Sequence, residues 1–252
     1  MQLNGLSVFV TGGGSGLGAA TARLMASKGA RVACFDLNKA NAEKVAGEIG
    51  GIGIGGDVTS EADAIAAFDV AAKAHGTPRV LMNCAGIGNA ITTVNKNGAF
   101  PLDAFKKIID VNLIGSFNML RLAAERMSKE NPIGEERGVI VNTASVAAFD
   151  GQIGQAAYSA SKGGIVGMTL PVARDLARFG IRVNTIAPGL FLTPLLQGLS
   201  EEAQRSLGAQ VPFPSRLGDP KEYAMLAVHI VENPMLNAET IRLDGAIRMA
   251  PR

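Results

Sequence analysis

The chain has 252 residues, of which 47% are hydrophobic and 18% are charged, a composition that excludes a disordered chain and allows one folded domain over residues 1–252. Its 24 Lys and Arg residues exceed its 22 Asp and Glu residues by only +2, so neither nucleic acid nor a membrane surface is indicated as a partner. No apolar run reaches the roughly 18–20 residues that a transmembrane helix needs.

The cysteine and histidine residues indicate neither a disulfide-bonded protein nor a metal-binding one. Cys34 and Cys84 both lie in apolar, strand-like runs without a CxxC pair, which indicates buried free thiols in a reducing cytoplasm. Neither His75 nor His229 has a Cys, Asp or His neighbour at ligand spacing, so no metal site is predicted. The first ten residues, MQLNGLSVFV, lack the basic flank and cleavage site of a signal peptide.

In chain order, short apolar strands alternate with longer amphipathic helices. Strands are expected at 6–10, 31–36, 51–56, 80–86, 138–145, 181–189 and 239–245, and helices at 16–28, 38–49, 60–75, 102–127, 155–178 and 219–232. The strands are continuously apolar, which is typical of a parallel sheet covered on both faces. The sequence therefore predicts an α/β fold, a doubly wound parallel sheet of about seven strands (a Rossmann fold), in a single domain. The connections 89–100 and 128–137 are expected to project as surface loops.

A glycine-rich segment, VTGGGSGLG, joins the first strand to the first helix. Gly12, Gly16 and Gly18 fit the spacing T-G-x-x-x-G-x-G, which differs from the G-x-G-x-x-G dinucleotide fingerprint. Such a turn brings the backbone close to a pyrophosphate at a helix N-terminus. An ordinary loop is the alternative for the glycines alone, but their place between strand and helix favours a nucleotide site.

Acidic residues close the second and third strands. Asp36 lies 20 residues after Gly16, where a carboxylate accepts hydrogen bonds from ribose hydroxyls and repels a 2′-phosphate. Because no Arg or Lys occupies residues 13–15 or Leu37, NAD is favoured over NADP as the cofactor. Asp57 is placed to meet the adenine amino group, with a helix cap as the alternative. The fourth strand closes on small residues that would let a cofactor cross the sheet edge, namely Asn83, Cys84, Ala85 and Gly86.

Tyr158 and Lys162 are one helical turn apart in AAYSASKGG, so they share a helix face. A free phenol has a pKa of about 10, and a unit charge at ~4 Å supplies roughly the 3–4 kcal/mol needed to lower it by two to three units. We therefore expect Lys162 to lower the pKa of Tyr158, and the pair to exchange a proton with an alcohol oxygen.

Two polar residues are expected beside this pair. Ser145, just past the fifth strand, could donate a hydrogen bond to the same oxygen. Asn112 lies mid-helix, where an amide is unfavourable without a task, and lining a water next to Lys162 is one. A Tyr-x-x-x-Lys pair alone is usually a surface coincidence, so the interpretation depends on all of these residues meeting at the carboxyl edge of the sheet.

The motifs TGGGSGLG, NCAG and YSASK, with Asn112 and Ser145, resemble the short-chain dehydrogenase/reductase family along the whole chain. TIAPGLFLTPLL and IRLDGAIRM further resemble the type 2 3-hydroxyacyl-CoA dehydrogenases, also described as multifunctional hydroxysteroid dehydrogenases. The resemblance implies a Ser–Tyr–Lys–Asn site, a homotetramer, and a Lys162 that also holds the nicotinamide ribose. It further implies cofactor contacts from Ser15, Leu17, Asp36, Asp57, Val58, Cys84, Pro188, Gly189, Phe191 and Thr193.

These features predict NAD-dependent oxidation of a secondary alcohol, with a short or branched 3-hydroxyacyl-CoA as the preferred substrate. Residues 190–210 are interpreted as a lid over an aliphatic pocket, with a core helix as the alternative, and Gln152 and Gln155 as polar contacts to the substrate besides Ser145 and Tyr158. A hydroxysteroid or other secondary-alcohol dehydrogenase is the alternative within the class, and a non-catalytic NAD sensor or scaffold is the alternative outside it. Because the chain begins almost at its first strand, without a transit segment, a bacterial cytoplasmic protein is expected.

Overall fold

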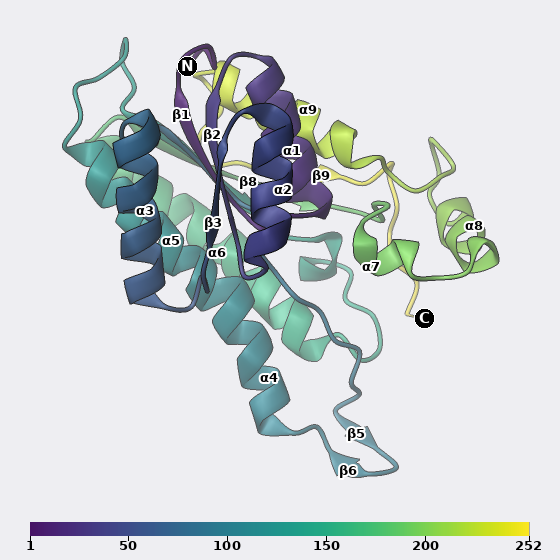
Figure 1. Ribbon diagram of the computed structural model, residues 1–252. Coiled ribbons are helices and arrows are strands. Elements are labelled where there is room, and N and C mark those ends of the chain that lie inside the picture. Colours follow the sequence, from purple (N-terminus) through teal and green to yellow (C-terminus); the bar gives the residue numbers. More distant parts are fainter. Residues whose placement is uncertain (252) are drawn as a thin grey trace.

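One seven-stranded parallel sheet, in the order β3-β2-β1-β4-β7-β8-β9, organises residues 1–251, which are the residues described by the computed structural model (Figure 1). Its strands are β1 (Ser7–Thr11), β2 (Arg31–Asp36), β3 (Ile52–Gly55), β4 (Val80–Asn83), β7 (Gly138–Thr143), β8 (Ile181–Pro188) and β9 (Thr240–Leu243). The chain runs outward from β1 to β3 and then returns to β4 on the other side of β1, so the strand order reverses between β1 and β4. The doubly wound sheet is confirmed, and its switch point is where such folds bind ligands. Residue 252, the last of the predicted domain, lies outside the described residues.

Helices cover both faces of this sheet. The helices α1 (Gly16–Ser27), α2 (Lys39–Ile49) and α9 (Pro220–Glu232) pack on one face, and α3 (Glu61–His75), α5 (Gly115–Ser128) and α6 (Ala156–Ala177) pack on the other (Figure 1). Neighbouring strand residues feed the two cores alternately, since Val8 and Val10 belong to the first and Phe9 to the second. This explains why the strands are continuously apolar.

The helix predicted over 102–127 is interrupted. It consists of α4 (Leu102–Ile109), a π-helical segment η1 (Asp110–Ile114) and α5. An inserted π turn shifts the register of the side chains that follow and is frequent at functional sites. The interruption places Asn112 in the irregular segment, and not in the regular helix that the sequence pattern predicts.

The two long connections are both more ordered than surface loops. Residues 89–100 contain the antiparallel pair β5 (Val94–Asn95) and β6 (Gly98–Ala99), which extends from the body beside α4 (Figure 1). Residues 128–137 are fastened by Arg79, whose guanidinium donates to the carbonyl of Asn131 at 2.9 Å. The first connection lies near the carboxyl ends of the strands and the second near their amino ends, so only the first can contribute to a site at the switch point.

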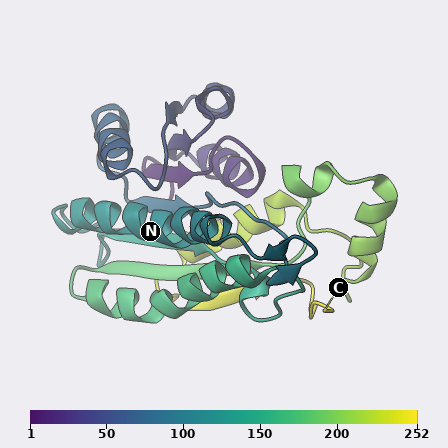
Figure 2. The same ribbon diagram turned by 90° about the horizontal axis from the view of Figure 1, so that it is seen from below.

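The segment predicted as a lid leaves the body after β8. It carries α7 (Pro194–Gln197) and α8 (Glu201–Ala209), and it lies at the same end of the molecule as the β5–β6 hairpin and the C-terminal residues (Figures 1 and 2). No helix among residues 1–251 combines the length and the apolar character needed to cross a membrane.

Candidate active site

The glycine turn between β1 and α1 is built by close backbone packing. Gly12 has φ of +62°, and a Cβ on Gly18 would lie 2.2 Å from the Gly12 carbonyl oxygen. Only glycine lets α1 begin this close to the turn. Ser15, the exposed N-cap of α1, makes no side-chain cap bond, and Leu17 follows it, partly exposed, in the first turn of the helix. The turn thus offers backbone N–H groups at a helix N-terminus, as a phosphate requires.

Thr11, the last residue of β1, fixes the next loop against this turn. Its hydroxyl accepts hydrogen bonds from the backbone N–H groups of Cys84 and Ala85, both at 3.1 Å. The sequence interpretation missed Thr11, although its position at the end of the first strand was the available signal. Both cysteines are free; Cys34 is buried as expected, and Cys84 is partly exposed as a residue while burial raises the pKa of its thiol.

The two acidic residues, Asp36 and Asp57, differ in which of their carboxylate oxygens accept hydrogen bonds from the protein. Asp36 accepts hydrogen bonds from the backbone of Gly14 at 3.0 Å and of Asn38 at 2.9 Å, which holds its carboxylate beside the glycine turn. Each oxygen keeps further acceptor capacity. Asp57 accepts from the N–H and the hydroxyl of Thr59, both at 2.8 Å, through one oxygen. The helix-cap alternative for Asp57 is wrong, since Ser60 is the N-cap of α3.

Two residues predicted to contact the cofactor turn their side chains into the protein. Val58 packs in the core against Gly115, where a Cβ would lie 2.6 Å from a Val58 methyl group. Asn83 is only 2% exposed, and its amide donates to the Ser116 carbonyl at 3.0 Å and to the Asn142 side chain at 2.9 Å. The Asn83 amide thus ties β4 to β7 and α5, and a contact of this residue with the cofactor stays a prediction.

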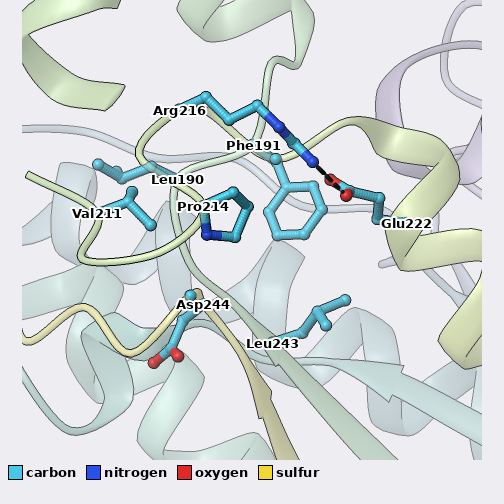
Figure 3. A pocket seen from close by; sticks show the side chains of 10 residues that line it. Leu190, Phe191, Val211, Pro214, Arg216, Glu222, Leu243 and Asp244 are labelled. Atoms are coloured by element: carbon cyan, nitrogen blue, oxygen red, sulfur yellow. Dashed lines mark hydrogen bonds and ion pairs between the residues drawn. The ribbon is translucent and has the colours of Figure 1, made fainter. Parts of the chain in front are cut away.

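The lid begins with two residues that face different environments. The Phe191 ring lines a cavity of about 110 Å³ at the base of the lid and packs against Gly218 (Figure 3). Thr193, by contrast, lies over the glycine turn, 3.7 Å from the position of a Cβ on Gly16. The ring of Phe191 thus lines the cavity, whereas Thr193 lies beside the glycine turn, and cofactor contacts from both residues stay predictions.

The end of β8 approaches β9 closely. Pro188 is its last residue, and a Cβ on Gly189 would lie 2.8 Å from the Cβ of Asp244. Glycine is needed here to let the chain pass β9 before it enters the lid. This passage directs the lid toward the glycine turn.

Asn112 holds the loop that follows β4. Its side chain, fully buried, accepts from the Ile87 N–H at 2.8 Å and donates to the Ile87 carbonyl at 2.9 Å. It also donates to the Ser161 hydroxyl at 3.0 Å, and Ser161 in turn donates to the Tyr158 carbonyl. Both N–H groups of this amide are used within the protein, so only its oxygen can still accept from a water next to Lys162, and that contact stays a prediction. Asn112 ties the loop to the helix that carries Tyr158.

Tyr158, Lys162 and Gly86 meet at the carboxyl edge of the sheet. The Lys162 ammonium lies 5.7 Å from the centroid of the Tyr158 ring and donates to the Thr143 carbonyl at 2.7 Å. A Cβ on Gly86 would lie 3.5 Å from the same ammonium, so the small residue leaves room beside it. Lys162 is only 4% exposed, and burial lowers its pKa to about 8.

The expected lowering of the Tyr158 pKa is not found in the protein alone. Burial raises the pKa of the phenol, and the neighbouring Ser145 hydroxyl acts in the opposite direction with a smaller effect. Lys162 lies under the ring, so its ammonium points to Thr143 and not to the phenol oxygen. The geometry brings phenol, ammonium and Ser145 together, but the effect of burial on the pKa of Tyr158 exceeds that of the Ser145 hydrogen bond.

Ser145 and the two glutamines differ in what they can still bind. Ser145 caps a short 3-10 helix by accepting from the Ala147 N–H at 3.1 Å, which leaves its own hydroxyl proton free to donate. Gln155 accepts from the Gln152 N–H at 3.0 Å, and Gln152 donates to the Ala250 carbonyl at 2.9 Å. The glutamines thus fasten the loop before α6 to the C-terminal segment, and a substrate contact from Gln155 stays a prediction.

This arrangement supplies a proton-exchanging phenol, a hydroxyl donor and a buried cation beside a turn that can bind a dinucleotide. Such a set can move a proton to or from an alcohol oxygen. Across residues 1–251, no group of three or more His, Cys, Asp or Glu side chains is arranged to hold a metal ion.

Comparison with known proteins bears on the same residues. The family model described as short chain dehydrogenase matches residues 7–204. The 3-hydroxyacyl-CoA dehydrogenase type-2 of Rattus norvegicus is 55% identical over 255 residues, which cover 99% of this chain and 98% of the relative. The crystal structure of 3-hydroxyacyl-CoA dehydrogenase type-2 from Mycobacterium avium matches with a TM-score of 0.94 at 41% identity, covering 98% of each chain. That of 3-ketoacyl-(acyl-carrier-protein) reductase from Brucella melitensis complexed with NADH matches with a TM-score of 0.86 at 31% identity, covering 98% of this chain and all of the other.

Proposed function

Because this chain belongs to the short-chain dehydrogenase family, we propose that it oxidises the 3-hydroxyl group of a short or branched 3-hydroxyacyl-CoA to the 3-oxo group with NAD. The family resemblance stated from the sequence is confirmed. The observation that carries the proposal is the buried Lys162 ammonium beneath Tyr158, at the sheet edge that also carries the glycine turn. The reaction is reversible, and the substrate class is that named for the relatives.

The residues at the switch point fit a dinucleotide. The turn at Gly12 and Gly18 is too tight for any Cβ, which leaves its backbone open to a pyrophosphate. Asp36 is held at the end of β2 with acceptor capacity for two ribose hydroxyls, and its charge disfavours the 2′-phosphate of NADP. The relative from Brucella melitensis, with the same fold, was crystallised with NADH. These observations support NAD as the cofactor.

Tyr158 takes the proton of the substrate hydroxyl in the oxidation, and Ser145 donates a hydrogen bond to the same oxygen. Burial disfavours the phenolate, so the reaction needs positive charge beside the phenol, and Lys162 is the buried cation nearest its ring. When bound, NAD would accept the hydride from the alcohol carbon and add its own positive charge to the site. Asn112 acts by holding the loop at Ile87 against α6.

Three finer features belong to the same proposal. Residues 190–210 close over the site as a lid, which is supported by the position of Thr193 over Gly16. The protein is a homotetramer, which is supported by the exposed apolar residues Ile114, Phe117 and Leu170 on its helices. It acts in the cytoplasm, where free thiols such as Cys34 and Cys84 persist. The molar mass from light scattering tests the tetramer.

A substrate panel tests the proposal. The protein is incubated with 3-hydroxybutyryl-CoA, with longer and branched 3-hydroxyacyl-CoA esters, and with a steroid alcohol, using NAD and NADP in parallel while NADH or NADPH absorbance is followed. We expect turnover of the CoA esters with NAD and a loss of roughly a thousandfold in Tyr158→Phe. An inert CoA ester beside an active steroid would refute the substrate, and equal rates with NADP would refute the role of Asp36. Full activity of Tyr158→Phe would refute the role of Tyr158, and a wild-type protein that binds NADH but oxidises none of these alcohols would support a non-catalytic NAD-binding protein.

A further inference from the structure

Tyr223, one of only two tyrosines in the chain, is buried behind the site and has no part in the chemistry described so far. It lies on α9 and is 0% exposed. Its hydroxyl is 2.7 Å from the hydroxyl of Thr143 and 3.7 Å from the sulfur of Cys84. A buried phenol oxygen is unfavourable unless it is hydrogen-bonded, and a phenylalanine would fill nearly the same space. The hydroxyl therefore needs an explanation that packing alone does not give.

Thr143 connects the two faces of the sheet at the end of β7. Its side chain follows those of Val139 and Val141, which belong to the core shared with Tyr223 on the α9 face. Its carbonyl oxygen accepts the hydrogen bond from the Lys162 ammonium, at 2.7 Å, and Lys162 belongs to α6 on the opposite face. A continuous contact path thus leads from the phenol of Tyr223 through one strand-end residue to the buried cation.

The position of Lys162 depends on that carbonyl. Among the described residues, Thr143 supplies the one hydrogen-bond acceptor of the ammonium. Thr143 is also the last residue of its strand, and the N–H of the next residue, Ala144, donates to the Ile186 carbonyl at 2.8 Å. This backbone bond holds one side of the peptide group that carries the Thr143 carbonyl, and the side-chain bond to Tyr223 fixes the same residue from the α9 face.

We propose that Tyr223 is a positioning residue, whose hydroxyl fixes Thr143 so that the Thr143 carbonyl holds the Lys162 ammonium beneath Tyr158. This proposal rests on the proposed function, since it assigns Lys162 its place in the same reaction. Cys84 completes the set of groups around the phenol oxygen of Tyr223. The role is carried out through Thr143, without contact between Tyr223 and the reacting atoms.

The experiment compares Tyr223→Phe, Thr143→Val and Thr143→Ser with the wild-type protein. Tyr223→Phe and Thr143→Val each remove one hydroxyl and keep the shape, and we expect kcat to fall roughly five- to tenfold, the rate equivalent of one net hydrogen bond. The KM for NAD should rise, because the family resemblance implies that Lys162 also holds the nicotinamide ribose, while the KM for the CoA ester should stay within about twofold. Thr143→Ser keeps the hydroxyl and restores kcat. The double variant loses no more than either single one, because both break the same path.

A second buried hydroxyl pair provides the matched control. Thr169 lies on the same helix as Lys162, and its hydroxyl is 2.6 Å from that of Thr185. Thr169→Val removes a comparable bond from the same helix and should lower the melting temperature without lowering kcat. If Thr169→Val lowers kcat as much as Thr143→Val, or if Tyr223→Phe and Thr143→Val both keep the wild-type kcat and NAD affinity, the proposal is wrong.

Failure of the proposed function can be told apart from failure of this proposal. Should the wild-type protein bind NADH but oxidise no CoA ester, the substrate assignment fails alone. The same variants are then titrated with NADH while cofactor fluorescence is followed. Positioning of Lys162 predicts roughly fivefold weaker binding in Tyr223→Phe and Thr143→Val and wild-type binding in Thr169→Val, while equal binding in all three would overturn it.

Discussion

Two buried cations lie at opposite ends of the same sheet and are compensated to very different extents. Arg182 opens β8 at the amino end and is 6% exposed, while Lys162 meets the carboxyl end and is 4% exposed. The guanidinium of Arg182 pairs with the Glu136 carboxylate and donates to the carbonyls of Ile230, Val231 and Leu236. For the Lys162 ammonium, the described residues supply the Thr143 carbonyl alone.

The difference separates a structural cation from a functional one. Burial alone would raise the pKa of Glu136, but the Met1 ammonium and the Arg182 guanidinium outweigh burial and keep that pKa below its usual range. No carboxylate plays that part for Lys162, and burial lowers its pKa to about 8. A buried charge without a counter-ion is unfavourable for folding and is found where a reaction needs it. The comparison implies that replacing the two cations should have opposite effects on stability.

The largest effect is expected for activity in Lys162→Met. Methionine fills similar space without charge, so the phenolate of Tyr158 loses the nearest positive group. We expect kcat/KM for the CoA ester to fall by roughly a thousandfold or more. A direct assay of NADH absorbance measures kcat/KM. Arg182→Met is the matched variant at the other end of the sheet. If Arg182→Met also lost activity per folded molecule, the distinction between a structural Arg182 and a functional Lys162 would be wrong.

The next largest effect is expected for stability in Arg182→Met. Removing the guanidinium leaves the Glu136 carboxylate with the Met1 ammonium alone and removes one hydrogen bond from each of three carbonyls, of which Val231 keeps the Met1 ammonium and Leu236 keeps the Asn184 amide as donors. Breaking a buried pair in this way lowers the free energy of unfolding by about 3–5 kcal/mol. Urea unfolding followed by circular dichroism measures it, and a loss below about 1 kcal/mol would contradict the structural role.

A smaller effect of opposite sign is expected for the stability of Lys162→Met. A pKa lowered from 10.5 to about 8 corresponds to roughly 3 kcal/mol of unfavourable free energy, of which the lost bond to Thr143 offsets about 1 kcal/mol. The variant should therefore be about 2 kcal/mol more stable than wild type at pH 7.

The pH dependence of the stability difference shows whether the greater stability of Lys162→Met comes from the lost charge. The unfolded lysine binds its proton up to its ordinary pKa of 10.5, whereas the folded one releases it near pH 8. The penalty in the wild type is complete below pH 8 and fades as pH rises to 10.5, so the stability difference between the two proteins should fade over the same range. A difference that stays constant across this range would show that packing, and not charge, is responsible.

How much of this site the sequence could predict depends on how far apart in the chain the contacting residues lie. Tyr158 and Lys162 share a helix face through local geometry, and the apolar strands predict the sheet because side-chain alternation is local too. Asn112 was found as a candidate, but its hydrogen bonds to Ile87 and Ser161 were not, since these partners lie 25 and 49 residues away. The contact of Thr143 with Tyr223 spans 80 residues and follows from packing across the sheet edge, which no local pattern encodes.

The smallest effect is expected for an exposed ion pair. Arg23 and Glu48 approach to 2.7 Å, but their side chains remain 47% and 40% exposed, so water already solvates both charges. Arg23→Met should change the free energy of unfolding by at most ~0.5 kcal/mol, and the change should shrink further at high salt. The same substitution thus differs between Arg23 and Arg182 chiefly in burial. If urea unfolding gave both variants the same loss, charge pairing itself would set the stability, and the contrast between the two buried cations would lose its physical basis.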